Sequence, residues 1–260
     1  MTTKPTMIYG VATDIGSVRS ENQDTCGVFP PGDEIHPKGK LFVVADGMGG
    51  HRGGKEASGL AVKMIARDFF ASDGVDISTS LARVIQAANE IVYDTGQEDS
   101  DLEGMGTTCV AMVVTGDRIH LARVGDSRAY RVTKKEIKQI TDDHSTVAEM
   151  QRRGILTAEE AKIHPERSVL YRALGTRPVA EVDVHPEIEV TSNEWYVLCT
   201  DGLTNMVEDN EIHEMVTGNA PQKACDELIR LANERGGFDN ITVEVIQIKM
   251  RDSFIDKLRS

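Results

Sequence analysis

The sequence predicts an α+β fold in which antiparallel strands are layered with pairs of helices. Short segments rich in β-branched residues follow one another with turn-like breaks between them, and this pattern indicates antiparallel pairing. Two amphipathic segments follow the first strands, and two more precede the last strand. Grouped strands and paired helices favour a layered α+β domain over a fold of alternating βαβ units.

The first part of the chain contains three predicted strands and one helix pair. Residues 7–13, 25–29 and 41–45 are short β-like runs, and the turn-rich residues 30–40 predict a surface hairpin between the last two. Apolar residues then recur at helical spacing in two further segments, 57–65 and 81–92. Each of these helices has one apolar face, so each is expected to cover a sheet.

The second part of the chain contains more strands and a polar insertion. Strands are predicted at 107–115, 118–124, 127–133 and 136–140, with hairpin-like breaks between them, and then at 181–184, 195–200 and 241–248. Residues 141–176 are polar and mixed, with short helical pieces at 146–153 and 157–163, which indicates an inserted lid or flap. Helices near 209–217 and 221–234 separate the last two strands.

Composition limits the class of protein. The chain has 260 residues, 40% hydrophobic and 27% charged, which suits one large domain or two small ones. The formal charge of −13 and the aromatic content of 5% argue against partners such as nucleic acid or an anionic membrane surface. No apolar run approaches the ~18 residues of a membrane span, and no signal peptide is expected. Four widely spaced cysteines predict reduced thiols and a cytoplasmic location.

Four aspartates stand in turns at the ends of apolar strands: Asp46, Asp126, Asp201 and Asp239. Any one of them alone reads more readily as an ordinary turn residue. Four carboxylates converging at one rim of a sheet would repel one another unless a cation lay between them. Hard divalent cations such as Mg²⁺ and Mn²⁺ accept such all-oxygen sites, whereas the histidines lack the spacing of zinc ligands.

A glycine-rich stretch at 46–54 surrounds the first of these aspartates. Small residues let a carbonyl turn inward as a ligand and let a bulky anion approach closely. The stretch lacks the G-K-[ST] ending and the G-x-G-x-x-G pattern, which argues against a nucleotide loop. Arg19 lies in the same N-terminal region as Asp24 and is a candidate cation for an anionic substrate, although a loop arginine is more often solvated.

Eight segments, spread over nearly the whole chain, together carry one family pattern. They are RSENQD (19–24), VVADGMGGHRGGKEAS (43–58), GMGTT (104–108), ARVGDSRAY (122–130), TDDHS (141–145), HPERSVLYRALG (164–175), LCTDGL (198–203) and DNITV (239–243). In this order the set resembles the metal-dependent serine/threonine protein phosphatases of type 2C, in their compact bacterial form.

The resemblance implies a four-layer αββα sandwich, in which two antiparallel sheets are flanked by helix pairs. It implies a single catalytic domain over residues 1–250, with a mobile flap at about 142–176, and a short C-terminal tail at 251–260. The flap would lie beside the catalytic cleft.

The resemblance also assigns roles in a metal centre. Two Mn²⁺ or Mg²⁺ ions would be bridged by Asp46, with the carbonyl of Gly47 on one ion and Asp201 and Asp239 on the other. Asp126 together with Asp201 would hold a weaker third ion. Asp24 would orient a metal-bound water.

Arg19 matches the arginine that grips the substrate phosphate in this family. His51 is the candidate general acid, and the alternative is that it only caps the glycine loop. The chain departs from animal members at Met48, where they carry a histidine, and from many bacterial members at Ser168, where they carry asparagine. For His144 and His164, structural hydrogen bonds are the preferred interpretation.

The expected activity is hydrolysis of phosphoserine and phosphothreonine in proteins by direct attack of a metal-bridging hydroxide, which reverses a serine/threonine kinase. The expected state is a cytoplasmic monomer that contacts phosphorylated proteins and neither nucleic acid nor membrane. Three alternatives remain open. They are a phosphatase dedicated to one regulator, a catalytically inactive module that binds phosphoproteins, and a metal-dependent hydrolase of nucleotides or small phosphates.

Overall fold

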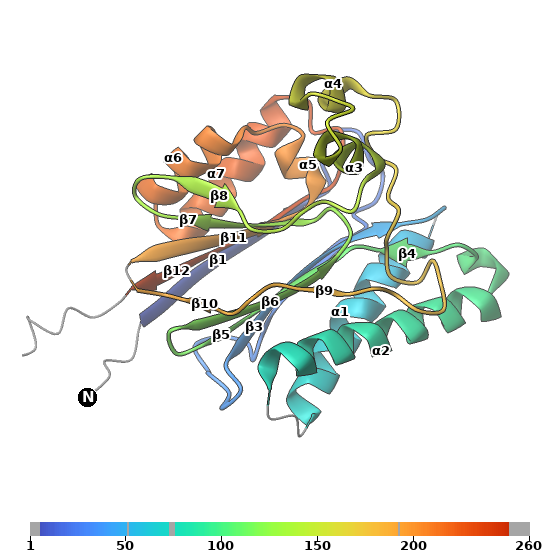
Figure 1. The fold of residues 1–260 in the computed structure, drawn as a ribbon, viewed down its shortest axis with the longest axis horizontal. Coiled ribbons are helices and arrows are strands. Elements are labelled where there is room, and N and C mark those ends of the chain that lie inside the picture. The colour runs from blue at the N-terminus through green and yellow to red at the C-terminus, as the bar shows by residue number, and fades with distance from the viewer. Residues whose placement is uncertain (1–5, 51, 73–75, 192, 250–260) are drawn as a thin grey trace, which may run out of the picture.

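Two antiparallel sheets pack face to face in the computed structural model, and helices cover the outer face of each (Figure 1). The structure describes residues 6–50, 52–72, 76–191 and 193–249. His51 and the tail at 251–260 therefore lie outside the described residues. The order of layers is helices, sheet, sheet, helices, which confirms the predicted αββα sandwich.

The first sheet, called the β1 sheet, has the strand order β1-β12-β11-β7-β8. Its strands are β1 (Thr6–Asp14), β7 (Arg128–Val132), β8 (Ile137–Gln139), β11 (Glu194–Cys199) and β12 (Ile241–Lys249). All its pairs are antiparallel. The last strand of the chain, β12, lies between the first strand and β11, so this sheet joins the two ends of the described chain.

The second sheet, called the β3 sheet, has the order β10-β6-β5-β3-β2, with β4 paired to β3 and β9 paired to β6. Its strands are β2 (Asp24–Phe29), β3 (Lys40–Met48), β4 (Gly106–Thr107), β5 (Cys109–Thr115), β6 (Arg118–Val124), β9 (Asp183–Val184) and β10 (Ile188–Glu189). Its pairs are also antiparallel.

Alternation of side chains along the strands builds the three apolar layers. In β12, Val243 and Val245 face the outer helices, whereas Ile246 and Ile248 face the other sheet. A strand buried on both faces therefore reads as a nearly continuous apolar run. The layer between the sheets joins side chains of both: Phe42, Val44, Val110, Met112, Leu121, Tyr196 and Leu198.

Two helix pairs close the outer layers. Helices α1 (Gly53–Ala71) and α2 (Ile77–Glu98) cover the β3 sheet, and α6 (Asp209–Gly218) and α7 (Pro221–Glu234) cover the β1 sheet. Short helical turns follow α2 and β11, as η1 (Ser100–Leu102) and α5 (Asp201–Thr204). The apolar spacing predicted each long helix. In α7, for example, Ala224, Leu228 and Ala232 lie one turn apart on the buried face.

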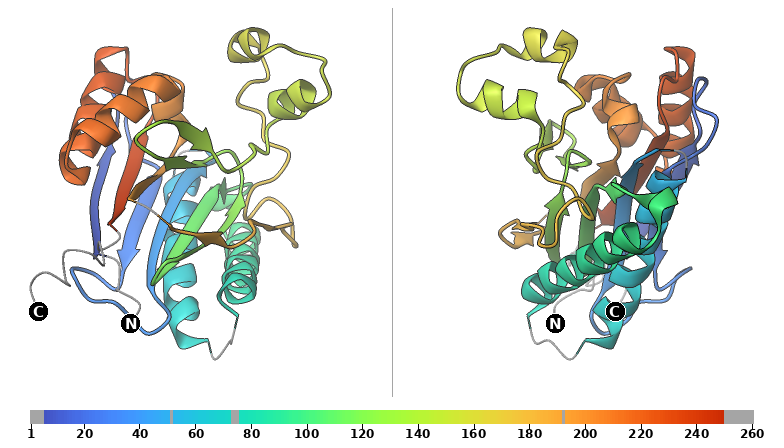
Figure 2. Two further views of the ribbon diagram at one scale, coloured as in Figure 1. Left: turned by 60° about the vertical axis from the view of Figure 1, so that its left-hand side comes forward. Right: turned by 90° about the vertical axis from the view of Figure 1, so that its right-hand side faces the viewer.

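The segment between β8 and β9 stands apart from the sandwich. It carries α3 (Thr146–Arg152) and α4 (Ala158–Ile163), and Figure 2 shows both helices projecting beyond the ends of the sheets. The Thr157 side chain begins α4 with a capping box that includes Glu160. The predicted helical pieces are therefore present, and movement of this segment as a flap stays a prediction.

Some predicted boundaries were wrong. The strand predicted at 41–45 continues to Met48, so Asp46 and Gly47 are strand residues and not turn residues. The strand predicted at 107–115 is divided at Thr108 into β4 and β5, and the short strand β10 was not predicted. In each case pairing with a distant strand decides the outcome, and such pairing leaves no local pattern.

Candidate active site

Five carboxylates from both sheets gather at one end of the sandwich. Asp24 begins β2 and lies directly opposite Asp46 on β3. Asp126 lies in the turn between β6 and β7. Asp201 is the first residue of α5, two residues after the end of β11, and Asp239 lies two residues before β12. The structure thus brings together all the aspartates that the sequence singled out.

These carboxyl groups influence one another strongly. Burial raises the pKa of Asp46 well above its ordinary value, and the charges of Asp24 and Asp201 add to the rise. Burial and then Asp201 likewise raise the pKa of Asp126. Burial raises the pKa of Asp24 to about 7, although hydrogen bonds from Thr242 and Thr200 act in the opposite direction. Carboxylates this close together can all be ionised only if a positively charged group or a cation lies beside them.

The donor set suits a hard divalent cation. Asp24 Oδ1 and Asp201 Oδ1 are buried and have no hydrogen-bond partner within the part of the chain that the structure describes. All the gathered side-chain donors are oxygens, as Mg²⁺ and Mn²⁺ prefer. Among the described residues, no three acidic, histidine or cysteine side chains already have the spacing of a metal site. The chemistry of the carboxylates therefore fits such ions.

Two threonines hold Asp24: Thr242 on β12 and Thr200 between β11 and α5. Thr200 Oγ1 and Thr242 Oγ1 both donate to Asp24 Oδ2, over 2.9 Å and 2.7 Å. This carboxylate is thereby tied across the interface between the sheets, with its other oxygen left unpartnered. Sequence reasoning did not single out either threonine. The alternation of β12 was the available signal, since it places Thr242 on the face toward the other sheet.

The backbone around Asp46 is held by a threonine pair. Asp46 N donates to Thr108 Oγ1 over 2.9 Å, and Asp46 O accepts from Thr107 Oγ1 and from Thr108 N, each over 2.9 Å. At Gly47 a Cβ would lie 2.0 Å from the carbonyl oxygen of Gly54, so only glycine fits where β3 passes the start of α1. The carbonyl expected to act as a ligand thus belongs to a rigid strand.

Arg19 lies at the mouth of this site. Its Nη2 donates to Asp239 Oδ2 over 2.8 Å. It also lines a cavity of about 390 Å³, together with Ser20, Glu21, Gln23, Gly49, Arg52 and Asn240. Two arginines thus line this cavity, and one of them, Arg19, is paired with a carboxylate of the site, which is a suitable setting for a phosphate ester.

The remaining predicted residues have mixed outcomes. His144 does make structural hydrogen bonds, because Gly125 N donates to its Nδ1 over 3.1 Å. His164 also does so, since its Nδ1 accepts from Glu166 N over 3.2 Å. Met48 ends β3 and pairs with Gly106 of β4. His51 lies outside the described residues, so its role as general acid stays a prediction.

Comparison with known proteins identifies the architecture. A sequence model described as protein phosphatase 2C matches residues 17–229. A serine/threonine phosphatase of Listeria innocua is 38% identical over 240 residues, covering 90% of this chain and 93% of that protein. The protein phosphatase PhpP of Streptococcus pneumoniae is 32% identical over 252 residues, covering 95% and 100%.

Two solved structures agree with these relatives. The serine/threonine phosphatase PstP/Ppp of Mycobacterium tuberculosis has a TM-score of 0.83 at 35% identity, covering 94% of this chain and 99% of that one. The catalytic domain of PstP in complex with two manganese ions has a TM-score of 0.80 at 32% identity, covering 94% and 98%. The chain therefore belongs to the protein phosphatase 2C family and is a metal-dependent serine/threonine protein phosphatase.

Proposed function

We propose that the carboxylate cluster at the end of the sandwich is the metal centre at which phosphoserine and phosphothreonine are hydrolysed. The observation that carries this proposal is the convergence of aspartates from both sheets at one end of the sandwich, where Asp24 lies opposite Asp46 and the buried oxygens Asp24 Oδ1 and Asp201 Oδ1 have no hydrogen-bond partner among the described residues. The enzyme uses two Mn²⁺ or Mg²⁺ ions, and a related structure contains two manganese ions. Its substrates are phosphorylated proteins.

Each aspartate has a proposed task. Asp46 would bridge the two ions, the carbonyl of Gly47 would help to hold one of them, and Asp201 and Asp239 would hold the other. Two such cations supply a water of lowered pKa and positive charge beside the phosphoryl oxygens. Asp24, held by Thr200 and Thr242, accepts a hydrogen bond from the attacking water through its unpartnered Oδ1 and so orients it.

Arg19 binds the phosphoryl group of the substrate. Its guanidinium is half exposed and faces the cavity, so two of its nitrogens can donate to phosphate oxygens. The charge that develops on these oxygens in the transition state strengthens this contact. His51 gives a proton to the leaving serine or threonine oxygen, and Asp126 with Asp201 holds a weaker third ion.

The finer features of the cellular role are also proposals. The phosphatase opposes a serine/threonine kinase and acts as a monomer in the cytoplasm, with residues 1–250 as one catalytic domain. No helix among the described residues is long and apolar enough to cross a membrane. The intact aspartate set supports catalysis, and nothing in the comparisons supports the inactive binding module.

Chelation tests this function. EDTA should abolish hydrolysis of a phosphothreonine peptide, and added Mn²⁺ or Mg²⁺ should restore it. Calorimetry should show Mn²⁺ binding to the wild type, strongly weakened in Asp201→Asn. The matched control is Asp117→Asn, which changes a partly exposed aspartate in a hairpin turn. Full activity in excess chelator, or unchanged binding in Asp201→Asn, would contradict the assignment.

A further inference from the structure

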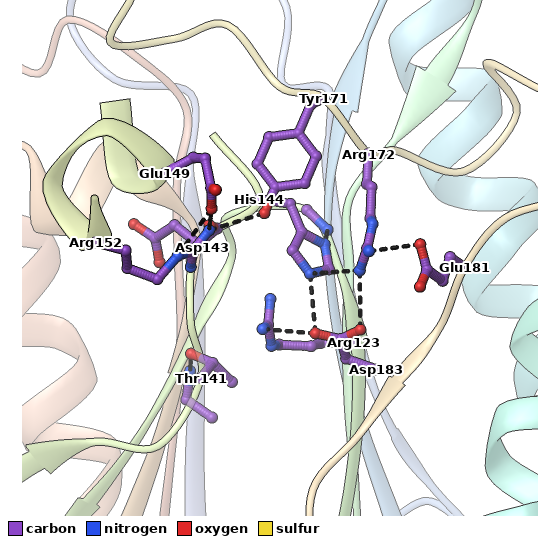
Figure 3. Close-up of polar contacts among 12 residues, drawn as sticks. Arg123, Thr141, Asp143, His144, Glu149, Arg152, Tyr171, Arg172, Glu181 and Asp183 are labelled. Carbon is purple, nitrogen blue, oxygen red and sulfur yellow. Dashed lines mark hydrogen bonds and ion pairs between the residues drawn. The ribbon is translucent and has the colours of Figure 1, made fainter. Parts of the chain in front are cut away.

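Asp183 joins three side chains from separate parts of the chain, as Figure 3 shows. Its Oδ2 accepts from Arg123 Nη2 over 2.9 Å and lies 3.1 Å from His144 Nε2. Its Oδ1 accepts from Arg172 Nη1 over 3.0 Å. The carboxylate belongs to β9, directly opposite Arg123 of β6, so it is attached to the β3 sheet.

Two of these partners stand at the two ends of the projecting α3–α4 segment. His144 precedes the segment and Arg172 follows it. The ends meet in a short antiparallel contact, in which Thr146 N donates to Val169 O over 2.8 Å and Tyr171 N donates to His144 O over 3.0 Å. One carboxylate on the sheet therefore binds both ends of the segment.

The contact continues from His144 toward the site. Gly125 N donates to His144 Nδ1 over 3.1 Å, so Nδ1 is the acceptor and the imidazole proton is assigned to Nε2, which donates to Asp183. His144 N also donates to Gly125 O over 3.1 Å. Gly125 has a φ of 104°, and it directly precedes Asp126. His144 thus holds Gly125, a residue with left-handed backbone geometry, through its imidazole at Gly125 N and through its own backbone amide at Gly125 O.

Burial supports this arrangement of charges. The side chain of His144 is 2% exposed and that of Arg123 is 8% exposed. Burial, and then the charge of Arg123, lower the pKa of His144, which keeps the imidazole neutral. Burial alone would raise the pKa of Asp183, but the hydrogen bond with His144 and the charge of Arg123 hold it below its ordinary value. A charged Asp183 therefore orients a neutral His144.

We infer that Asp183 is a positioning residue, which acts through His144 to hold the Gly125–Asp126 turn and through Arg172 to hold the far end of the α3–α4 segment. The inference rests on the proposed function only where it links the turn to catalysis through Asp126. The hydrogen-bond chain itself can be tested without metal or substrate.

Hydrogen exchange measured by mass spectrometry on the metal-free protein tests the chain directly. In Asp183→Asn, which loses the charge but keeps the shape, the amide of Gly125 and those of residues 144–146 and 169–172 should exchange roughly tenfold faster or more. Amides of β5 and β12 should be unchanged. The matched control is Glu181→Gln, because Glu181 pairs with Arg172 but is not bonded to His144 or Arg123. In Glu181→Gln all these amides should exchange at the wild-type rate.

A second variant separates the contact of Asp183 with His144 from its contact with Arg172. Arg172→Gln leaves the buried Arg123 pair intact, so exchange should quicken at 169–172 and stay at the wild-type rate at Gly125. It also keeps the test open if Asp183→Asn does not fold. Wild-type exchange at Gly125 in Asp183→Asn, equal acceleration in Glu181→Gln, or acceleration at Gly125 in Arg172→Gln would overturn the inference.

Kinetics then test the link to Asp126. With a phosphothreonine peptide, Asp183→Asn should lower kcat about tenfold and leave KM near its wild-type value, because the turn and not the substrate contact is disturbed. A rise in KM at unchanged kcat would overturn this link. If the wild type does not hydrolyse the peptide, the proposed function fails, and the exchange comparison still decides the role of Asp183.

Discussion

Arg19 Nη2 and Asp239 Oδ2 lie 2.8 Å apart, although 220 positions separate the two residues along the chain. The guanidinium that would bind the substrate is thus paired with a carboxylate that would bind a cation. A cation bound by Asp239 would compete with Arg19 for the negative charge of this carboxylate. We therefore expect metal loading to weaken this ion pair and to leave Arg19 freer to contact the phosphoryl group.

Arg19→Gln should raise KM for a phosphothreonine peptide roughly tenfold or more, because a charge-assisted contact to the phosphate is lost. Mn²⁺ binding measured by calorimetry should stay as tight or become tighter, since Asp239 loses its competitor. Arg118→Gln, which removes an arginine paired with surface acids, is the control. Weaker Mn²⁺ binding or an unchanged KM would show that Arg19 has another role.

Asp126→Ala should keep the two-ion centre and lose most turnover, because only the loosely bound third ion depends on this carboxylate. Crystals soaked in Mn²⁺ should contain three ions in the wild type and two in the variant. Asp117→Ala serves as the control for loss of a turn carboxylate. Loss of every ion, or full turnover, would refute the assignment.

His51→Ala should slow a phosphothreonine peptide by roughly 10²-fold or more, and p-nitrophenyl phosphate far less. A serine or threonine alkoxide needs a proton to leave, whereas p-nitrophenolate leaves readily without one. Both rates are compared at equal metal saturation. Equal defects on the two substrates would point to a loop-capping role for His51.

Glu244 is an unusual core residue. It is fully buried on β12, and apart from the nearby backbone amide of Gly27 its carboxyl oxygens meet no hydrogen-bonding group in the described ranges. Burial raises its pKa well above the ordinary value, with the Gly27 backbone acting in the opposite direction. The folded protein therefore keeps this carboxyl protonated at pH values where the unfolded chain has released the proton.

Glu244→Gln should stabilise the protein relative to the wild type at pH 8, and by less at pH 5. The wild type loses up to about 1.4 kcal/mol of unfolding free energy per pH unit between the unfolded pKa, about 4.3, and the raised folded pKa. Below the unfolded pKa the difference between the two proteins no longer changes with pH. Urea denaturation at several pH values measures the difference in unfolding free energy between the two proteins. The control is Glu98→Gln, which changes an exposed glutamate. If the difference in unfolding free energy between Glu244→Gln and the wild type does not change with pH, Glu244 is charged in the folded protein.

Local patterns predicted much of this molecule. Apolar residues that recur with periods of two and of 3.6 predicted the main strands and the four long helices. Aspartates at the ends of predicted strands indicated the candidate site. The four-layer arrangement and the individual ligand roles came from the ordered family motifs. Those roles stay predictions until the metal centre is measured.

Other features depend on contacts that no local pattern contains. Asp24 is held by threonines 176 and 218 positions away. Asp46 was assigned to a turn because Asp-Gly favours turns, but pairing with Asp24 and the β4 contact extend the strand through it. No sequence pattern marks Asp183, because its three partners come together only in the folded protein.

The position of β12 has a consequence for the timing of activity. This strand is the last one described, yet it lies between β1 and β11, and it brings Thr242 to Asp24 just after Asp239. A chain in which β12 is not yet in place lacks an inner strand of the β1 sheet and the contact of Thr242 with Asp24. We therefore expect phosphatase activity to appear only when β12 has entered the sheet.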